Sequence, residues 1–361
     1  LFPVLCFLGY QGYLWVSVFF AELLALFRPV VQPMSGSGSY ASRLKKYPAK
    51  GVCGLPEMYD SKEKLEIKLI TLIKWWQEAS RVVVLTGAGI STSAGISDFR
   101  GPKGVWTLEL EREKEQKRKR SRSKQRGFGK RRKKSAKLSA AANTTPTLSP
   151  SSTTSTPSPT TMFPATNTNN VVSSFESAQP TLTHRAITAL VEQDKISYVV
   201  TQNVDGLHQR AKLPRGKLAI LHGCVFEEMC EKCGALYFRD KEVNTISFQP
   251  TGNVCEKQEC GGACRDTLLD WEDPLPENQL CPSEEECKAA DLIVTLGTSL
   301  RIEPAASLPL LCKEEEQGEP RRKSAHRRIV IINLQETPKD SASDMLLRAK
   351  VDMVMERVCT S

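Results

Sequence analysis

The stretch LTGAGISTSAGISDFRGP, residues 85–102, places a glycine turn directly after a short apolar run. Such a run is typical of a buried strand that feeds a ligand-binding turn. Gly87 and Gly89 let the backbone approach a pyrophosphate and leave amides that donate to it. The third glycine of the G-x-G-x-x-G pattern is missing, because Thr92 stands in its place, and Asp98, Phe99 and Arg100 follow. A dehydrogenase needs the complete pattern, so the stretch indicates a different cofactor chemistry.

Further apolar runs alternate with helical patterns along the chain, which favours an α/β fold with a Rossmann-like parallel sheet. The predicted strands are residues 82–85, 197–200, 292–296 and 328–332. Apolar residues at three-and-four spacing predict helices over residues 62–79 and 182–192.

Small and polar residues follow each predicted strand. Because open α/β sheets bind ligands at the carboxyl ends of their strands, we expect these residues to line one site. They are Thr86-Gly87-Ala88-Gly89, Gln202-Asn203-Val204-Asp205, Gly297-Thr298-Ser299 and Asn333-Leu334-Gln335.

Four of the twelve cysteines have the spacing of a structural zinc site. Cys230 and Cys233 form a C-x-x-C pair, and Cys255 and Cys260 supply the second pair. Cys264 lies close by, so the fourth ligand stays open between Cys260 and Cys264. Thiolate ligands indicate a reducing compartment rather than a secreted disulfide framework.

His222 follows the apolar run in KLAILHG and so lies at another strand end. A lone histidine is more often a satisfied core residue than a catalyst. At this position, however, a neutral imidazole beside a ribose is able to take a hydroxyl proton.

Residues 109–173 interrupt the globular pattern. Residues 109–137 hold fifteen Lys/Arg against four Glu, whereas the whole chain has a net charge of +9, so the remainder is slightly acidic. Residues 138–170 have no charged side chain and contain sixteen Ser/Thr and five Pro. Neither part buries enough apolar surface to offset the entropy of ordering, which predicts a long disordered insertion. The basic blocks suit nuclear import or contact with DNA phosphates, although a solvated charged face is the simpler alternative.

Residues 1–27 are almost wholly apolar, with Glu22 as their only acidic residue. They are long enough to span a bilayer, but no basic region precedes them. We expect residues 1–33 to lie outside the mature protein and Met34 to mark its start, and we expect no membrane partner. A real membrane anchor is the alternative.

Several motifs, in this order, resemble those of the sirtuins, which are NAD-dependent protein deacylases, and in particular the sirtuin-6 subgroup. The resemblance covers residues 39–108 and 174–357. It rests on TGAGIS, GISDFRG, QNVDGLH, LHG, the cysteine pattern, LGTSL and INLQ, and on GVCGLPEMYD, GPKGVWTLE, SFESAQPTLTH and RDTLLDWEDPLP.

The resemblance implies that NAD+ is cleaved, with His222 as general base and with Asn203 and Asp205 around the nicotinamide pocket. It implies that some candidate residues contact the phosphates and ribose, that others shape the cofactor loop, and that the rest hold the adenosine half of NAD+. These residues are Gly87, Ala88, Gly89, Thr92, Asp98, Phe99, Arg100, Trp106, Gln202, Gly297, Thr298, Ser299, Asn333, Leu334, Gln335 and Val351. Ser97 departs from the family pattern, which has proline there.

The sequence therefore predicts a nuclear NAD+-dependent deacylase that acts on an acyl-lysine protein, with histone tails as the substrate that the resemblance implies. A basic segment, residues 112–134, would contact chromatin or DNA. Two alternatives share the same residues: mono-ADP-ribosyl transfer, and a zinc-stabilised chromatin-binding module with weak catalysis. The expected organisation is an N-terminal segment 34–79, an NAD-binding domain formed by 80–108, 174–227 and 288–357, and a zinc module 228–268.

Overall fold

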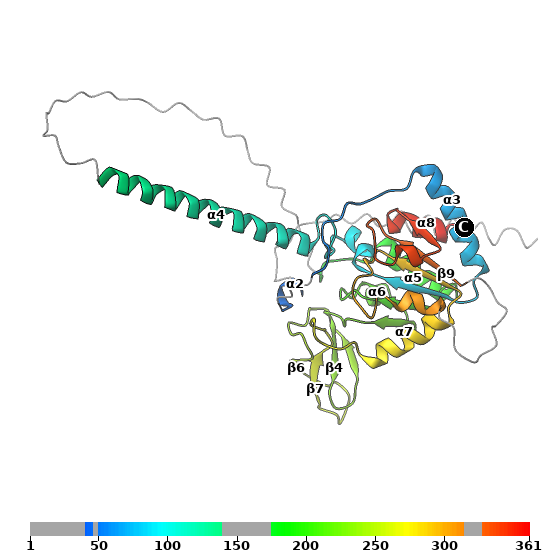
Figure 1. The fold of residues 1–361 in the computed structure, drawn as a ribbon. Helices are drawn as coiled ribbons and strands as arrows, with labels where there is room; N and C mark the ends of the chain where they lie inside the picture. Colours follow the sequence, from blue (N-terminus) through cyan, green and yellow to red (C-terminus); the bar gives the residue numbers. More distant parts are fainter. Residues whose placement is uncertain (1–39, 46–49, 139–174, 314–326) are drawn as a thin grey trace, which may run out of the picture.

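The computed structural model describes residues 40–45, 50–138, 175–313 and 327–361. Its centre is a six-stranded parallel sheet in the order β10-β9-β8-β1-β2-β3 (Figure 1). The strand order reverses direction at β1 and β8, as it does in sheets that bind dinucleotides, so the expected Rossmann-like α/β fold is confirmed. The strands are β1 Val82–Thr86, β2 Tyr198–Thr201, β3 Leu218–Ile220, β8 Leu292–Leu296, β9 Arg328–Ile332 and β10 Met345–Leu347.

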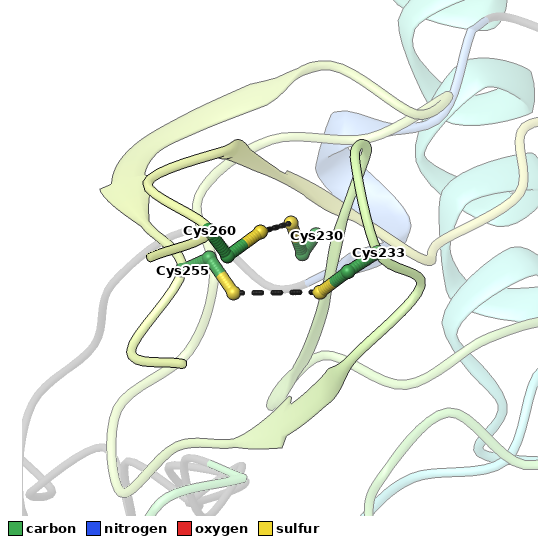
Figure 2. Close-up of side chains that lie close together, drawn as sticks. All are labelled: Cys230, Cys233, Cys255 and Cys260. Carbon is green, nitrogen blue, oxygen red and sulfur yellow. Dashed lines mark hydrogen bonds between the residues drawn. The ribbon is translucent and has the colours of Figure 1, made fainter. Parts of the chain in front are cut away.

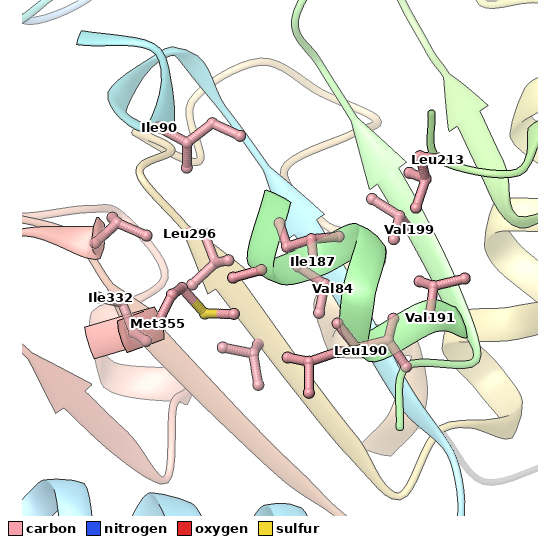
Figure 3. Close-up of a cluster of buried hydrophobic side chains, with 14 of the residues drawn as sticks. Val84, Ile90, Ile187, Leu190, Val191, Val199, Leu213, Leu296, Ile332 and Met355 are labelled. Atoms are coloured by element: carbon pink, nitrogen blue, oxygen red, sulfur yellow. The ribbon is translucent and has the colours of Figure 1, made fainter. Parts of the chain in front are cut away.

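The sheet is buried on both faces because successive side chains of a strand point to opposite sides. Val82 and Val84 of β1 belong to a cluster under α3, α5 and α8, whereas Val83 and Leu85 belong to a second cluster under α7 and η4. Figure 3 shows part of the first cluster, where side chains of α5 and α8 pack against the sheet. The elements are α3 Lys62–Glu78, α5 Leu182–Glu192, α7 Glu277–Ala289, η4 Leu308–Lys313 and α8 Val351–Cys359.

The predicted strands and helices are confirmed to within a residue or two. Local caps explain where the helices begin. The Ser61 hydroxyl accepts from the Lys64 amide at 3.3 Å before α3, and Thr181 forms a capping box with His184 before α5.

A second, antiparallel sheet in the order β5-β4-β7-β6 forms a separate module beside the parallel sheet (Figure 1). Its strands are β4 Glu227–Cys230, β5 Leu236–Phe238, β6 Pro250–Val254 and β7 Ala263–Asp266. The remaining short elements are α2 Tyr40–Arg43, η1 Ala88–Ile90, η2 Thr92–Ala94, α6 Leu207–Arg210, η3 Arg215–Lys217 and η5 Asp340–Ala342.

The structure corrects the prediction for the basic segment. Residues 109–138 are not irregular but continue α4, Val105–Leu138, which extends away from the two sheets (Figure 1). The segment contains no proline and is rich in Glu, Lys, Arg and Gln, which are good helix formers. A Glu115–Lys119 pair with a Nζ–Oε1 distance of 3.5 Å adds local support. Burial was the wrong criterion here, because a helix needs no core contact to satisfy its backbone.

Two sequence predictions lie outside the described residues: the apolar N-terminal segment 1–33 and the Ser/Thr/Pro-rich part of the insertion, residues 139–173. Within the described part of the chain, no helix combines the length and the apolar character that crossing a membrane requires.

Candidate functional site

The floor of the candidate site is a close contact between two backbone turns, one after β1 and one after β8. The amides of Gly87 and Gly89 donate to the carbonyls of Leu296 and Gly297, at 3.0 and 2.8 Å. The expectation that both amides are free for a phosphate is therefore wrong. Among the described residues, the amide of Ala88 between them has no protein acceptor, so it is the donor that this turn leaves for a ligand.

A buried polar network joins this turn to the end of β2. Asn203 Nδ2 donates to the Gly87 carbonyl at 3.1 Å and to Ser91 Oγ at 3.3 Å. Ser91 Oγ in turn donates to Asp205 Oδ2 at 2.6 Å. Burial raises the pKa of Asp205, although the hydrogen bond from Ser91 opposes this shift. The sequence predicted Asn203 and Asp205 as site residues but not Ser91, which could have been found as the last residue of the TGAGIS motif.

His222 lies just after β3 with its ring half-buried. Its Nδ1 is 2.9 Å from the Gln202 carbonyl oxygen. A carbonyl only accepts, so Nδ1 carries the proton and Nε2 keeps a free lone pair in the neutral ring. Burial lowers the pKa of His222, and the nearby Arg100 charge lowers it further. The result is an oriented imidazole in the form that is able to accept a proton.

Gly223 holds His222 in place through a backbone conformation that only glycine adopts easily. Its φ is +75°, and an added Cβ would lie 1.9 Å from the Thr267 carbonyl oxygen. We expect Gly223→Ala to lower the free energy of unfolding by about 2–5 kcal/mol, from strain plus overpacking, as measured by urea denaturation. Gly216→Ala is the matched control, because an added Cβ there meets no atom within 4 Å. Equal stability of the two variants would contradict this account.

The cofactor loop, residues 98–106, is wound tightly against itself. Asp98 Oδ1 accepts from the Gly101 amide at 3.1 Å, so this carboxylate shapes the loop. Trp106 is buried and packs between Phe99 and Trp271, with ring centroids 4.7 and 5.0 Å away and ring planes tilted by 43° and 41°. Trp271 was quoted within RDTLLDWEDPLP but not named as a site residue, because its contact depends on the tertiary fold.

Arg100 leaves the same loop and lies over the Trp106 ring, with Cζ 4.5 Å from the ring centroid. Its Nε donates to the Lys50 carbonyl at 3.0 Å. Burial lowers the pKa of Arg100 to about 10, so the guanidinium remains charged at neutral pH. A charged group held on an aromatic face is a ready partner for a phosphate.

The turn after β9 supplies the opposite side of the candidate site. Asn333 Nδ2 donates to the Gln335 carbonyl at 2.8 Å, and Gln335 Nε2 donates to the Leu55 carbonyl at 2.5 Å. Arg348 holds the turn by donating to the carbonyls of Asn333 and Gln335, at 2.9 and 2.7 Å. Val351 begins α8 and is buried in the main core, next to this turn in the fold.

Three more predicted residues lie in the same region. Gln202 Nε2 donates to Thr298 Oγ1 at 3.1 Å and thereby ties the ends of β2 and β8 together. Thr92 is exposed, and its hydroxyl donates to the Gly89 carbonyl at 3.0 Å. The ends of five parallel strands thus meet at one edge of the sheet, as the sequence predicted.

The antiparallel module carries the four predicted cysteines in one group (Figure 2). The Sγ atoms of Cys230, Cys233, Cys255 and Cys260 all lie within 4.8 Å of one another. The Cys230–Cys260 and Cys233–Cys255 Sγ distances are 3.7 and 3.5 Å. A tetrahedral zinc ion with Zn–S bonds of about 2.3 Å needs sulfur atoms about 3.8 Å apart. The four cysteines therefore fit one structural zinc ion.

Cys264, the alternative ligand, is not part of this group. It is fully buried on β7, opposite Cys230 in the strand register, and packs as a small apolar side chain. Tyr237 contacts the group instead, with Oη 3.0 Å from Cys255 Sγ.

Together, the fold and these contacts define an α/β protein with a strand order of the dinucleotide-binding kind, polar turns at its strand ends and a four-cysteine metal module. Residues 122–304 match the model of the Sir2 family, and the chain belongs to that family.

Two relatives are named NAD-dependent protein deacetylases. SRT1 of Arabidopsis thaliana is 38% identical over 89% of this chain and 55% of its own length. Sirt6 of Drosophila melanogaster is 34% identical over 90% of this chain and 84% of its own length. The chain thus spans about half the length of the plant relative. A solved ADP-ribose complex of a mutant Sir2 homologue has a TM-score of 0.50 and 27% identity, and covers 80% of this chain and 94% of that one.

Proposed function

We propose that the protein is an NAD+-dependent protein-lysine deacylase that releases nicotinamide and O-acyl-ADP-ribose. The observation that carries this proposal is His222, whose Nδ1–H is fixed on the Gln202 carbonyl. Its Nε2 is therefore available as a base at the edge of the sheet where the polar turns meet. The names of the relatives support the same activity.

Two observations support NAD+ binding at these strand ends. The Ala88 amide has no protein acceptor among the described residues, and Arg100 is a charged guanidinium on the cofactor loop. In the proposal, Ala88, Thr92 and Arg100 hold the phosphates and the adjoining ribose. The turns after β8 and β9 hold the adenosine half, through Gly297, Thr298, Ser299, Asn333, Leu334 and Gln335, with Val351 behind them.

Bound NAD+ supplies the ribose carbon to which the acyl oxygen of the lysine side chain bonds as nicotinamide leaves. The residues of this chain position the reactants and remove a proton from a ribose hydroxyl. Asn203 and Asp205, rigidly linked through Ser91, line the nicotinamide side. His222 Nε2 takes the proton of a ribose hydroxyl, and that oxygen attacks the acyl carbon. One water enters, the acyl group stays on ADP-ribose, and the lysine amine departs.

The three aromatic rings at the cofactor loop, including Trp271 from outside it, have a matching role. Phe99, Trp106 and Trp271 form a continuous apolar cover, and Trp106 is 3% exposed. Such a cover excludes water from the glycosidic bond, so that the acyl oxygen rather than water reacts. The zinc ion in this proposal is structural, because four thiolates leave no open coordination position.

The activity is tested by measuring nicotinamide release from NAD+ by the full chain, with acetylated and with myristoylated histone H3 peptides. Release that depends on the peptide, with formation of O-acyl-ADP-ribose, supports the proposal, and the acyl preference tells whether long-chain deacylation is included. ADP-ribose that becomes attached to a protein instead would favour mono-ADP-ribosyl transfer. A folded, zinc-loaded chain that releases no nicotinamide would overturn the enzyme proposal and leave the binding module.

The pH profile provides an independent test of the base. Because burial lowers the pKa of His222, its neutral form persists below the usual pKa of about 6.5. We expect the acid limb of kcat/KM to have its midpoint below pH 6.5, in measurements from pH 5 to 8. ADP-ribose affinity and zinc content, followed at each pH, separate titration of the base from loss of structure. A midpoint at or above pH 7 would contradict the assignment.

We further propose that the protein acts on histone or other chromatin proteins in the nucleus, with α4 contacting DNA. The support is the net charge of +11 over residues 109–137, concentrated on one extended helix. Deleting residues 112–134 is expected to weaken binding to duplex DNA, most strongly at low salt, and to leave a tagged protein in the cytoplasm. Unchanged DNA affinity and unchanged nuclear signal would overturn this part.

A further inference from the structure

Arg100 has a second arginine as its neighbour, which the candidate site described above does not use. An added Cβ on Gly51 would lie 3.8 Å from Arg100 Nε and 4.0 Å from Arg301 Cδ. The two half-buried side chains therefore flank the same point of the backbone. Their proximity has an electrostatic consequence, since the Arg301 charge contributes to the lowered pKa of Arg100 after burial has acted.

Among the described residues, neither arginine of this pair forms a salt bridge with a carboxylate, although the Asp98 charge opposes the lowering of the Arg100 pKa. The hydrogen bond of the Arg301 side chain in this part of the chain runs from Nη2 to the Glu336 carbonyl oxygen, at a long 3.4 Å. Asp98 is the acidic neighbour of Arg100, but its carboxylate accepts from the Gly101 amide within the cofactor loop. The third cation nearby, Lys50, is paired with Glu109 at 2.5 Å. Two adjacent cations that form no salt bridge and have one nearby carboxylate between them still favour an anionic ligand.

The position of the pair tells which anion it suits. Arg301 lies two residues after Ser299, in the turn after β8, and it contacts the residue that follows Gln335. Arg100, on the other side, is close enough to His222 to lower its pKa. The pair therefore spans the interval between the general base, His222, and the proposed adenosine side. In a dinucleotide that interval is occupied by the pyrophosphate.

We propose that Arg301 is a specificity-determining residue that, with Arg100, forms a two-arginine grip on the pyrophosphate of the cofactor. This inference rests on the proposed function and adds a residue to it. Planar guanidinium groups donate in pairs to phosphate oxygens, so two of them neutralise the two charges of a pyrophosphate. The grip binds the diphosphate, whereas the turns after β8 and β9 bind the adenine and its ribose.

The test is calorimetric binding to the full chain and needs no turnover. Arg301→Gln is expected to weaken ADP-ribose binding about 10- to 100-fold, the effect of losing a charge-assisted hydrogen bond, and to leave adenosine binding unchanged. Arg301→Lys should recover part of the affinity. Raising the salt concentration should reduce the difference in ADP-ribose affinity between Arg301→Gln and the wild type. Arg185→Gln is the control, because Arg185 is exposed on α5 and also donates to a carbonyl, that of Pro180.

Each other outcome overturns the inference. Equal loss of adenosine and ADP-ribose binding would mean that Arg301 only holds the turns together. An effect seen with 2′-phospho-ADP-ribose but not with ADP-ribose would move the contact to the ribose phosphate. Unchanged ADP-ribose affinity would remove Arg301 from the site while the proposed function stands. A wild-type chain that binds no ADP-ribose would overturn the proposed function as well.

Discussion

Replacing His222 by glutamine is expected to lower the rate of lysine deacylation by roughly 10²- to 10⁴-fold, the usual contribution of a positioned general base. Glutamine donates and accepts hydrogen bonds but does not take up a proton near neutral pH. The measurement is O-acyl-ADP-ribose formation from NAD+ and an acetylated peptide at saturating concentrations. Because the loss concerns a chemical step, ADP-ribose affinity and thermal stability should change little.

A chemical rescue sharpens this prediction. In a His222→Ala variant, added imidazole should restore part of the rate, since the exogenous base occupies the space left by the ring. The rescue should follow the neutral fraction of the imidazole as the pH is varied. A His222→Gln variant that keeps more than a tenth of the wild-type rate, or an alanine variant without rescue, would remove His222 from the role of base.

Replacing Cys255 by serine is expected to release the zinc ion and unfold the antiparallel module. A serine hydroxyl stays protonated at neutral pH and binds zinc poorly, whereas the four Sγ atoms form a closed ligand group. The apparent free energy of zinc binding in small structural sites is about 10–16 kcal/mol, far more than so small a sheet gains from its own core. The measurement is zinc per chain by mass spectrometry, together with thermal unfolding. We expect one zinc ion in the wild type and almost none in the variant.

Cys264→Ala is the matched control for this experiment. Cys264 is as buried as Cys230 and faces it across the strands, but it lies outside the ligand group. The variant should keep its zinc and lose only a little stability, from the missing sulfur atom. Zinc loss in Cys264→Ala together with zinc retention in Cys260→Ser would show that Cys264, and not Cys260, is the fourth ligand.

The sheet was predictable from the sequence because its strands are buried on both faces and read as short apolar runs. The run at 82–85 has nothing polar within it, and β1 is buried along its whole length. β10 was not predicted, because three residues, Met345–Leu347, between polar neighbours carry no periodic signal. Its place in the sheet comes from pairing with β9, which is a tertiary effect.

The basic segment illustrates the opposite case. Its composition correctly indicated that it would bury no apolar surface, and residues 111–121 of α4 are exposed. The inference from lack of burial to lack of structure was the error. Helix formation depends on local propensity and backbone hydrogen bonds, which that composition also favours.

The candidate site was predictable as a set of strand ends but not as a set of contacts. Topology alone brings the turn at 87–89 close to Gln202 and Gly297. The partners that hold these residues, such as Trp271 and Arg348, are far away in the chain, and no local pattern marks them. The engagement of the glycine amides likewise depends on the approach of a second turn.

That approach divides the site into a fixed and an adjustable part. An added Cβ on Gly87, Gly89 or Gly297 would meet atoms of the facing turn at 2.6 to 2.8 Å, so the two central turns are interlocked peptide group against peptide group. Apart from Thr298 Cβ, which would lie 2.6 Å from a Cβ on Gly87, the atoms in this contact belong to the backbone, so side-chain replacements have little means of adjusting it. Selectivity among related ligands is therefore expected to depend on side chains around this floor, such as those of Arg100 and Arg301 in the proposed phosphate grip. An engineer who wishes to change the ligand should vary these side chains and leave the glycines untouched.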